Sequence, residues 1–233
     1  MKLENLVQEL AKVHVDLPDL DIEKLRIYAS LLKEWNEKMN LTSIVEEEEV
    51  VLKHFYDSLL PCALTDFNNK SIADIGSGAG FPGLVWAIAY PSSTVTLIDA
   101  TKKKFLFLEE VTKQLGLKNV LFHVGRVEDM KDQKESFDLV TSRGFASMNV
   151  FLEVAAPLTK VQGQVIALKG SKGNEEMKEA KEAMGILGLV YGKRIATSLP
   201  ESGDIRMNFL LLKNKPTPIK YPREWAKIIK HPL

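Results

Sequence analysis

The sequence of 233 residues contains one cysteine, no excess of either charge and no apolar run long enough to cross a bilayer. A single cysteine excludes an internal disulfide and a cysteine-rich metal site. The 31 basic residues balance the 31 acidic ones, so any surface for nucleic acid has to be local. The N-terminus lacks a signal-peptide pattern. We expect a globular, cytoplasmic protein with no membrane segment, no metal and no obligate protein partner.

Glycine is concentrated where the chain changes from an apolar segment to a helix. Asp74 ends the apolar segment, and glycines follow at every second position from Gly76 to Gly80 and again at Gly83. They let the backbone turn tightly and approach a ligand, and the next helix begins with free amides. A dinucleotide fingerprint needs glycine where Phe81 stands. The pattern instead resembles the first motif of S-adenosylmethionine-dependent methyltransferases, which holds the amino-acid end of the cofactor; an ordinary glycine-rich turn is the alternative.

The spacing of apolar residues changes near residue 70. Before it, apolar residues recur at helical spacing and predict helices over 3–13, 21–39, 47–52 and 54–64, with Asp21 as an N-cap. After it, strands alternate with helices. The predicted strands cover 71–76, 94–99, 120–124, 137–142, 164–169, 189–195 and 207–214, and the predicted helices cover 84–89, 103–115, 149–158 and 175–187.

The last two strands leave no room for a crossover helix, so they should pair antiparallel. The sequence therefore predicts an α/β fold with a Rossmann-like seven-stranded sheet, in which five parallel strands are completed by a C-terminal hairpin. This arrangement resembles the S-adenosylmethionine methyltransferase fold, whereas a nicotinamide dehydrogenase would continue with another crossover. We divide the chain into an N-terminal helical extension (1–68), a methyltransferase domain (69–214) and a basic C-terminal tail (215–233). Residues 213–233 carry six basic residues and one acidic residue.

Several charged residues follow the predicted strands. Asp99 ends the second strand, where an acid reaches the two ribose hydroxyls of a nucleotide; it is also placed to cap the next helix, and both roles are compatible. Val127 and Glu128 follow the third strand, beside the expected adenine position. Lys102–Lys104 oppose the dipole of the helix that they begin, so a phosphate backbone is one candidate partner, with a solvated face as an equal alternative for each lysine.

The fourth strand ends at Arg143, close to the expected methyl group. The chain lacks the Asn/Asp-Pro-Pro-aromatic tetrapeptide of enzymes that methylate exocyclic amines. Cys62 lies in an apolar helical segment upstream, so we interpret it as a core residue and not as a nucleophile for pyrimidine carbon 5. Arg143 suits a carboxylate, a phosphate or the O6/N7 edge of guanine, with a structural ion pair as the alternative.

Together, in this order, a set of short segments resembles the bacterial RsmG family, also called GidB. The resemblance runs from about Leu25 to Asn214, and the segments are Asn40–Thr42, His54–Leu59, Asp74–Gly83, Asp99–Lys104, Arg126–Asp129, Ser142–Ala146 and Ala167–Gly170. It implies a methyltransferase that modifies N7 of a guanine in the 16S ribosomal RNA of the small subunit. The resemblance implies that S-adenosyl-L-methionine contacts Gly76, Gly78, Phe81, Asp99, Val127, Glu128 and Arg143. The glycine motif adds Asp74 to these contacts. Gly144 departs from the alanine expected there.

Guanine N7 has a lone pair and no proton to lose, so this chemistry needs positioning and no general base. The catalytic residue stays unknown, with Arg143 as the best candidate for positioning. Phe81, Phe145 or His54 could stack on the guanine, or be core. The candidate RNA-binding residues are Lys102, Lys103, Lys104, Arg126, Lys169, Lys172, Arg206 and the basic tail.

Three other functions stay open at this stage. A methyltransferase of the same fold could act on a small molecule, in which case the basic tail has no role. A non-catalytic RNA-binding assembly factor could keep the cofactor site for stability. A nicotinamide enzyme is the least favoured.

Overall fold

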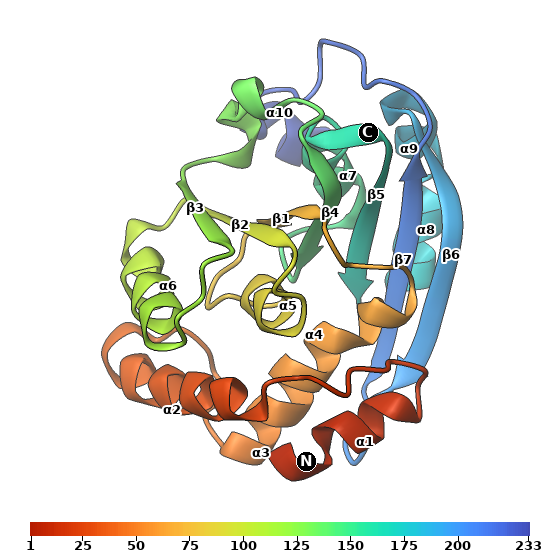
Figure 1. Ribbon diagram of the computed structural model, residues 1–233. Helices are drawn as coiled ribbons and strands as arrows, with labels where there is room; N and C mark the ends of the chain where they lie inside the picture. The colour runs from red at the N-terminus through yellow and green to blue at the C-terminus, as the bar shows by residue number, and fades with distance from the viewer.

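The computed structural model describes residues 1–233. Its centre is one seven-stranded sheet in the order β3-β2-β1-β4-β5-β7-β6 (Figure 1). Strands β1 to β5 are parallel, and β7 runs antiparallel to both β5 and β6. The predicted fold class is therefore confirmed. The strands are β1 Ser71–Ile75, β2 Thr94–Asp99, β3 Val120–Val124, β4 Phe137–Arg143, β5 Thr159–Lys169, β6 Leu189–Ser198 and β7 Ile205–Lys213.

The helices of the sheet region are α5 Gly83–Ala89, α6 Lys102–Gln114, α7 Met148–Ala155, α8 Gly173–Glu179 and α9 Lys181–Leu187. Before the sheet, a 3₁₀ turn (Leu3–Asn5) leads into α1 Leu6–Ala11, and α2 spans Ile22–Met39. The Asp21 side chain accepts a hydrogen bond from the Lys24 amide at 3.0 Å, which confirms the predicted N-cap. None of the helices combines the length and apolar composition that a bilayer crossing requires.

Residues 47–63 form one helical rod instead of two helices. It consists of α3 Glu47–Val50, a π-helical segment Val51–Tyr56, α4 Asp57–Leu59 and a 3₁₀ turn Leu60–Ala63. The wider π-helical turn lies in the middle of the rod, where such turns often serve functional sites. It carries His54, and the first residue after it is Asp57.

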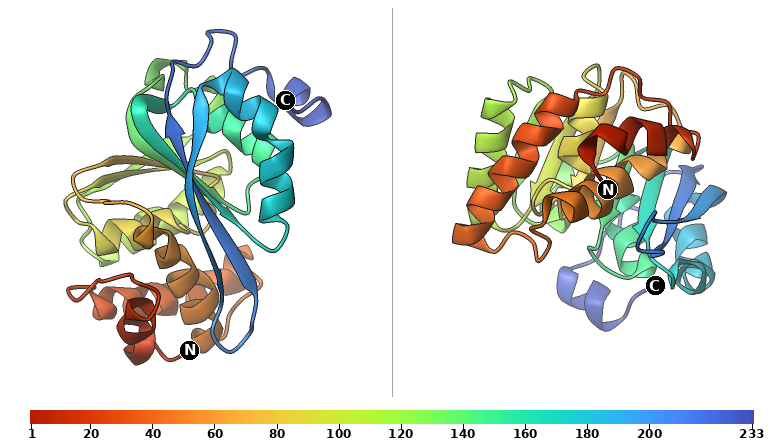
Figure 2. Two further views of the ribbon diagram at one scale, coloured as in Figure 1. Left: turned by 90° about the vertical axis from the view of Figure 1, so that its right-hand side faces the viewer. Right: turned by 90° about the horizontal axis from the view of Figure 1, so that it is seen from below.

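Successive residues of each central strand point into two separate cores, as strands covered on both faces require. Ile72 packs into a core with the N-terminal helices, α5 and α6, whereas its neighbour Ala73 faces the core of α7 and α9. Figures 1 and 2 show these two helical layers on opposite faces of the sheet. Leu199, at the far end of the β6–β7 hairpin, joins the N-terminal core, so the long hairpin reaches the N-terminal helices (Figure 2).

Among the elements of the sheet region, two differ most from their predicted bounds. The helix predicted over 175–187 is divided at Ala180, whose ψ of 1° is not helical. Glu176 of the first piece is bonded to Lys169 and to the Met148 amide, which holds this piece against β5 and α7. Strand β5 begins five residues earlier than the predicted 164, at Thr159, which pairs with Phe137 of β4. The register then shifts before Gln164 pairs with Leu139, and Gln162, with a φ of +69°, lies in this irregular segment.

The basic tail is not a free tail. It folds back over α7 and ends in a short helix, α10 (Trp225–Lys230). The Lys213 ammonium is buried and hydrogen-bonded to the carbonyl of Ala156 and to Thr217, so it cannot meet RNA. The N-terminal helices share one core with the sheet. The division of the chain at residues 68 and 214 therefore stays a proposal.

Candidate functional site

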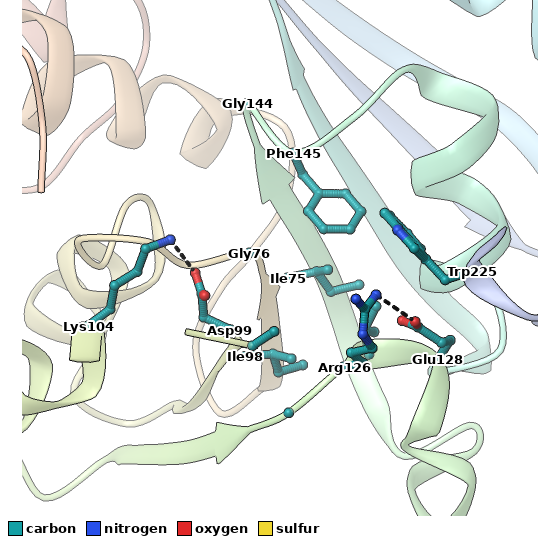
Figure 3. Close-up of a pocket in the computed structure, with 13 residues that line it drawn as sticks. Ile75, Gly76, Ile98, Asp99, Lys104, Arg126, Glu128, Gly144, Phe145 and Trp225 are labelled. Carbon is teal, nitrogen blue, oxygen red and sulfur yellow. Dashed lines mark hydrogen bonds and ion pairs between the residues drawn. The ribbon is translucent and has the colours of Figure 1, made fainter. Parts of the chain in front are cut away.

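A cavity of about 330 Å³ lies at the carboxyl ends of the parallel strands. It sits where the chain order reverses between β1 and β4, the place at which open α/β sheets bind ligands. Figure 3 shows Asp99 and Lys104 on one side of it, and Phe145 and Trp225 on another, with Arg126 and Glu128 next to Trp225. The lining residues are Ile75, Gly76, Ile98, Asp99, Ala100, Lys104, Gly125, Arg126, Val127, Glu128, Gly144, Phe145 and Trp225.

The glycine loop has a conformation that only glycine adopts easily. Gly76, Gly78 and Gly80 have φ angles of +70°, +58° and +97°. The Gly76 amide donates to the Ile98 carbonyl at 2.8 Å, which ties the loop to β2. A Cβ on Gly76 would lie 2.7 Å from the Phe145 ring, so the loop and the end of β4 approach each other here only because this side chain is absent.

Asp99 lies at the end of β2 with its carboxylate at the cavity. One oxygen accepts from the Gly78 amide at 3.0 Å and from Lys104 at 2.9 Å, and the other accepts from the Thr101 amide at 2.9 Å. Burial alone raises the pKa of Asp99, but these donors outweigh it and hold the pKa below its usual value. A carboxylate has about four acceptor positions, so one remains for a ligand hydroxyl.

Asp74 does not line the cavity, and its predicted contact with the cofactor stays a prediction. Its side chain is fully buried beneath the glycine loop, and one oxygen accepts from the Gly83 amide at 2.8 Å. The other oxygen has no hydrogen-bond partner in the protein. Burial raises the pKa of Asp74 to about 7, although the Gly83 amide and Arg143 oppose this. In the structure, this acid holds the loop against the start of α5.

Phe81 is buried as well. Its ring packs at near-parallel angles against Tyr28, with 5.2 Å between centroids, and against His54, at 4.4 Å. The Arg143 guanidinium lies 5.2 Å from the same ring. Phe81 therefore has the core position that the sequence left open for it, whereas His54 packs on Phe81 and also lines a second cavity described below, so stacking of a guanine on His54 stays a prediction. Phe145, which lines the cavity, stays a candidate.

A second cavity, of about 680 Å³, adjoins the first. The two share Gly144 and Phe145, which form the wall between them. Six of the fourteen residues that line the second cavity are charged. The lining residues are Ile44, Lys53, His54, Asp57, Arg143, Gly144, Phe145, Ala146, Ser147, Leu168, Lys169, Gly170, Glu176 and Arg206.

Asp57 joins two arginines at this cavity. One carboxylate oxygen accepts from Arg206 Nε at 3.0 Å, and the other lies 3.3 Å from Arg143 Nη1. Arg143 also donates to the Lys53 carbonyl at 2.8 Å. Two cations thus share one buried carboxylate, which leaves a net positive charge beside the cavity. The structural ion pair considered for Arg143 exists, and it lies at the site.

His54 is neutral and has no free nitrogen. Nδ1 lies 3.1 Å from Arg143 Nη2, which can only donate, and 3.2 Å from the Lys53 carbonyl, which can only accept. Nε2 lies 3.0 Å from Thr42 Oγ1. Burial, and then the charge of Arg143, lower the pKa of His54 to about 3. The imidazole therefore orients Arg143 and is not available as a base.

The predicted RNA-binding residues divide into two groups. Lys104 is paired with Asp99, Lys169 with Glu176 at 2.7 Å, and Arg206 with Asp57. These charges are used within the protein, so their prediction as RNA contacts is weakened. Lys102, Lys103 and Lys172 are exposed, and Arg126 is exposed with only a 3.3 Å contact to Glu128.

Sequence reasoning missed Lys53, Asp57 and Trp225 as site residues. Asp57 is part of a segment that carries the family resemblance, so a role could have been expected for it. Trp225 offered no signal, because nothing in its neighbourhood in the sequence resembles a ligand site. Cys62 is partly buried against the N-terminal core, and burial raises the pKa of its thiol to about 12, which agrees with a core role.

A model of the GidB family, described as rRNA small subunit methyltransferase G, matches residues 21–198. The chain belongs to this family. It is 42% identical over 234 residues to a protein named ribosomal RNA small subunit methyltransferase G from Staphylococcus haemolyticus, covering 99% of this chain and 98% of the relative. A Staphylococcus aureus protein of the same name (strain N315) is 42% identical over 236 residues, covering 100% and 99%.

Solved structures extend the likeness of this GidB-family chain to the methyltransferase fold. A SAM-dependent methyltransferase from Aquifex aeolicus matches with a TM-score of 0.56 and 16% identity, over 78% of this chain and 98% of that one. TYW2 from M. jannaschii, determined in complex with AdoMet, matches with a TM-score of 0.52 and 17% identity, over 63% and 70%. At these identities the likeness shows the fold.

Proposed function

We propose that this GidB-family protein transfers the methyl group of S-adenosyl-L-methionine to N7 of a guanine in the 16S ribosomal RNA of the small subunit. Its full-length relatives are named as methyltransferases of small-subunit ribosomal RNA. The observation that carries the finer proposal is the pair of cavities that meet at Gly144 and Phe145. One has the chemistry of a nucleoside site, and the other is charged and open to a nucleobase.

The first cavity fits the cofactor by its chemistry. Its size lies in the range of small-ligand sites, of roughly 300–1,000 Å³. Gly76 exposes backbone, Asp99 has one acceptor position left for a ribose hydroxyl, and Val127 with Glu128 lines the far end. The bound cofactor would supply an electrophilic methyl group on a sulfonium. The protein has to hold it and aim it at the second cavity.

The second cavity suits N7 as the acceptor because most of its possible bases are engaged within the protein. Asp57 is bonded to two arginines, and both nitrogens of His54 are engaged. Glu176 accepts from Lys169 and from the Met148 amide through one oxygen, Oε2. An acceptor that had to lose a proton before attack would depend on the other oxygen of Glu176. Guanine N7 needs no such step.

Arg143 is the residue that we propose to position the guanine. It lies at the carboxyl end of β4, and Asp57, His54 and the Lys53 carbonyl fix its guanidinium. A fixed guanidinium suits the O6/N7 edge of guanine or a neighbouring phosphate. Placing the reacting atoms in line supplies about 7–11 kcal/mol of a barrier in well-oriented reactions. Lys102, Lys103, Arg126 and Lys172 are proposed to contact the RNA backbone.

The test uses small subunits from cells that lack this protein. Subunits, naked 16S RNA and a metabolite extract are each incubated with the protein and labelled S-adenosylmethionine. We expect label in 16S RNA at a guanine that becomes cleavable after reduction, as N7-methylguanine does. Label in metabolites only would support the small-molecule alternative, and cofactor binding without any transfer would support an assembly factor. Asp99→Asn should reduce transfer, whereas Asp132→Asn, on an exposed turn, should not.

A further inference from the structure

The C-terminal segment is fixed to α7 by a buried ion pair. Arg223 Nε and Nη2 donate to the two oxygens of Glu153 at 2.7 and 2.6 Å, and the Arg223 amide donates to the same carboxylate at 3.1 Å. The Glu153 side chain has no exposed surface. A buried carboxylate is costly without a partner, so this bidentate geometry specifies where the segment lies.

Two residues further along, Trp225 stands at the first cavity. Its indole lines the cavity, and its ring centroid lies 5.7 Å from that of Phe145. Figure 3 shows the two rings side by side, with Trp225 next to Glu128 and Arg126 and across the cavity from Asp99 and Lys104. The aromatic wall thus faces the same space as the acid proposed for the ribose. The family model ends at residue 198, before this segment.

We propose that Trp225 is a cofactor-contacting residue that covers the base of the methyl donor, and that Glu153 and Arg223 are positioning residues that hold it there. The inference deepens the proposed function and rests on it. An aromatic face beside Val127 and Glu128 is suited to a flat purine, because every base has a π-face on which to stack. The pair of rings also suits a cationic sulfonium. The segment predicted as a basic tail is therefore part of the nucleoside site.

The first experiment measures binding of S-adenosylhomocysteine by calorimetry. Trp225→Ala should weaken it roughly tenfold, within the range that base–aromatic stacking gives, and Trp225→Phe should weaken it less. Ile229→Ala is the matched control, since Ile229 lies on the same short helix, is half exposed and does not line the cavity. Equal affinities in the wild type and Trp225→Ala would overturn this inference and leave the proposed function standing. No binding to the wild type would overturn the proposed function as well.

Tryptophan fluorescence gives a second readout that does not depend on turnover. Of the three tryptophans, only Trp225 lines a cavity at the site. Binding should change the emission of the wild type and of Trp35→Phe, but not that of Trp225→Phe. An unchanged response in Trp225→Phe would contradict contact between the indole and the ligand.

The positioning pair is tested with Glu153→Gln and, in case that variant does not fold, Arg223→Lys. Both should raise the KM for the methyl donor several-fold and leave kcat at saturating donor within about twofold, because they displace Trp225 and not the reacting atoms. A lower melting temperature with an unchanged KM would show a purely structural role and overturn this part of the proposal.

Discussion

Gly76 is the residue at which the nucleoside site depends most directly on the absence of a side chain. Its φ of +70° is costly for any residue with a Cβ, and that Cβ would lie 2.7 Å from the Phe145 ring. Phe145 also forms part of the wall between the two cavities. A change at Gly76 therefore strains the loop and moves the wall.

We expect Gly76→Ala to lower the affinity for S-adenosylhomocysteine about tenfold or more, equivalent to at least ~1.4 kcal/mol. Gly116→Ala is the matched control. Gly116 has a similar φ of +63°, but nothing lies within 4 Å of its Cβ position. Gly116→Ala should lose stability through the same backbone strain, about 1–2 kcal/mol, and should keep the wild-type affinity for S-adenosylhomocysteine. Thermal melts measure the loss of stability in both variants, and calorimetry measures the affinity. Equal affinities of Gly76→Ala and Gly116→Ala would contradict the role given to Phe145.

Asp74 makes the stability of the protein depend on pH in the direction opposite to most carboxylates. Burial raises its pKa to about 7 in the folded protein, above the value of 3.8 that an exposed aspartate has. Between these values the folded state binds more protons than the unfolded state, so this residue's contribution to stability falls as pH rises. Asp74→Asn keeps an oxygen for the Gly83 amide and removes the titration.

The unfolding free energy of Asp74→Asn, relative to wild type, should therefore increase by about 2–3 kcal/mol between pH 5 and pH 8. Denaturant unfolding at several pH values measures this difference, in which the titrations of all other groups cancel. Asp132→Asn, at an exposed position, should show no such trend. A difference that stays constant with pH would show that Asp74 is ionised in the folded protein throughout.

At the scale of elements, helix α2 supports the glycine loop from outside the sheet. The Tyr28 hydroxyl donates to the Ala79 carbonyl at 2.5 Å, and the Tyr28 ring packs on Phe81. A Cβ on Gly80 would lie 2.6 Å from the same hydroxyl. The N-terminal helices thus do more than cover the sheet, because they fix the loop that we propose holds the cofactor.

Removing this bond should loosen the loop. Tyr28→Phe leaves the buried Ala79 carbonyl without its donor, and we expect a loss of about 1–2 kcal/mol in stability. The affinity for S-adenosylhomocysteine should fall several-fold. Tyr56→Phe is the control, because Tyr56 is equally buried and lies on the neighbouring helical rod away from the glycine loop. Equal losses of affinity in both variants would mean that general destabilisation, and not the loop contact, is responsible.

The elements that could be predicted from the sequence are those whose pattern is local. Short segments rich in apolar residues mark β1, β2 and β4, and the short gap between β6 and β7 requires their antiparallel pairing. The division of the helix at Ala180 could not be predicted, because it follows from the bonds of Glu176 to distant segments. The same holds for the π-helical segment, whose His54 meets Arg143 only in the folded protein.

The candidate site could be predicted where it depends on the order of the strands, but not where it depends on contacts between distant segments. Asp99, Val127 and Glu128 follow strands whose carboxyl ends meet at one edge of the sheet, so their proximity follows from topology. Asp74 precedes the loop in the same way, yet its side chain turns beneath the loop and not into the cavity. Trp225 reaches the cavity from the other end of the chain. No local pattern encodes that return, which depends on the pairing of Arg223 with Glu153.

For the whole molecule, the distribution of charge matters more than its sum. The formal net charge is zero, and several cations near the cavities are already paired within the protein. RNA binding should then depend on a small number of unpaired cations. Lys102, Lys103 and Lys172 are exposed and near the carboxyl edge of the sheet, since they follow β2 and β5 directly.

Each lysine that contacts a phosphate releases counterions, so the logarithm of the RNA affinity falls linearly with the logarithm of the salt concentration. We expect Lys103→Gln and Lys172→Gln each to weaken RNA binding and to reduce the magnitude of this slope by about 1. Lys33→Gln is the matched control, because Lys33 is exposed on α2, makes no ion pair and follows no strand of the sheet. Filter binding of 16S RNA at a series of salt concentrations measures the slope. If all three variants kept the wild-type slope, the RNA would have to contact another face of the protein, and the proposed path across the carboxyl edge of the sheet would be wrong.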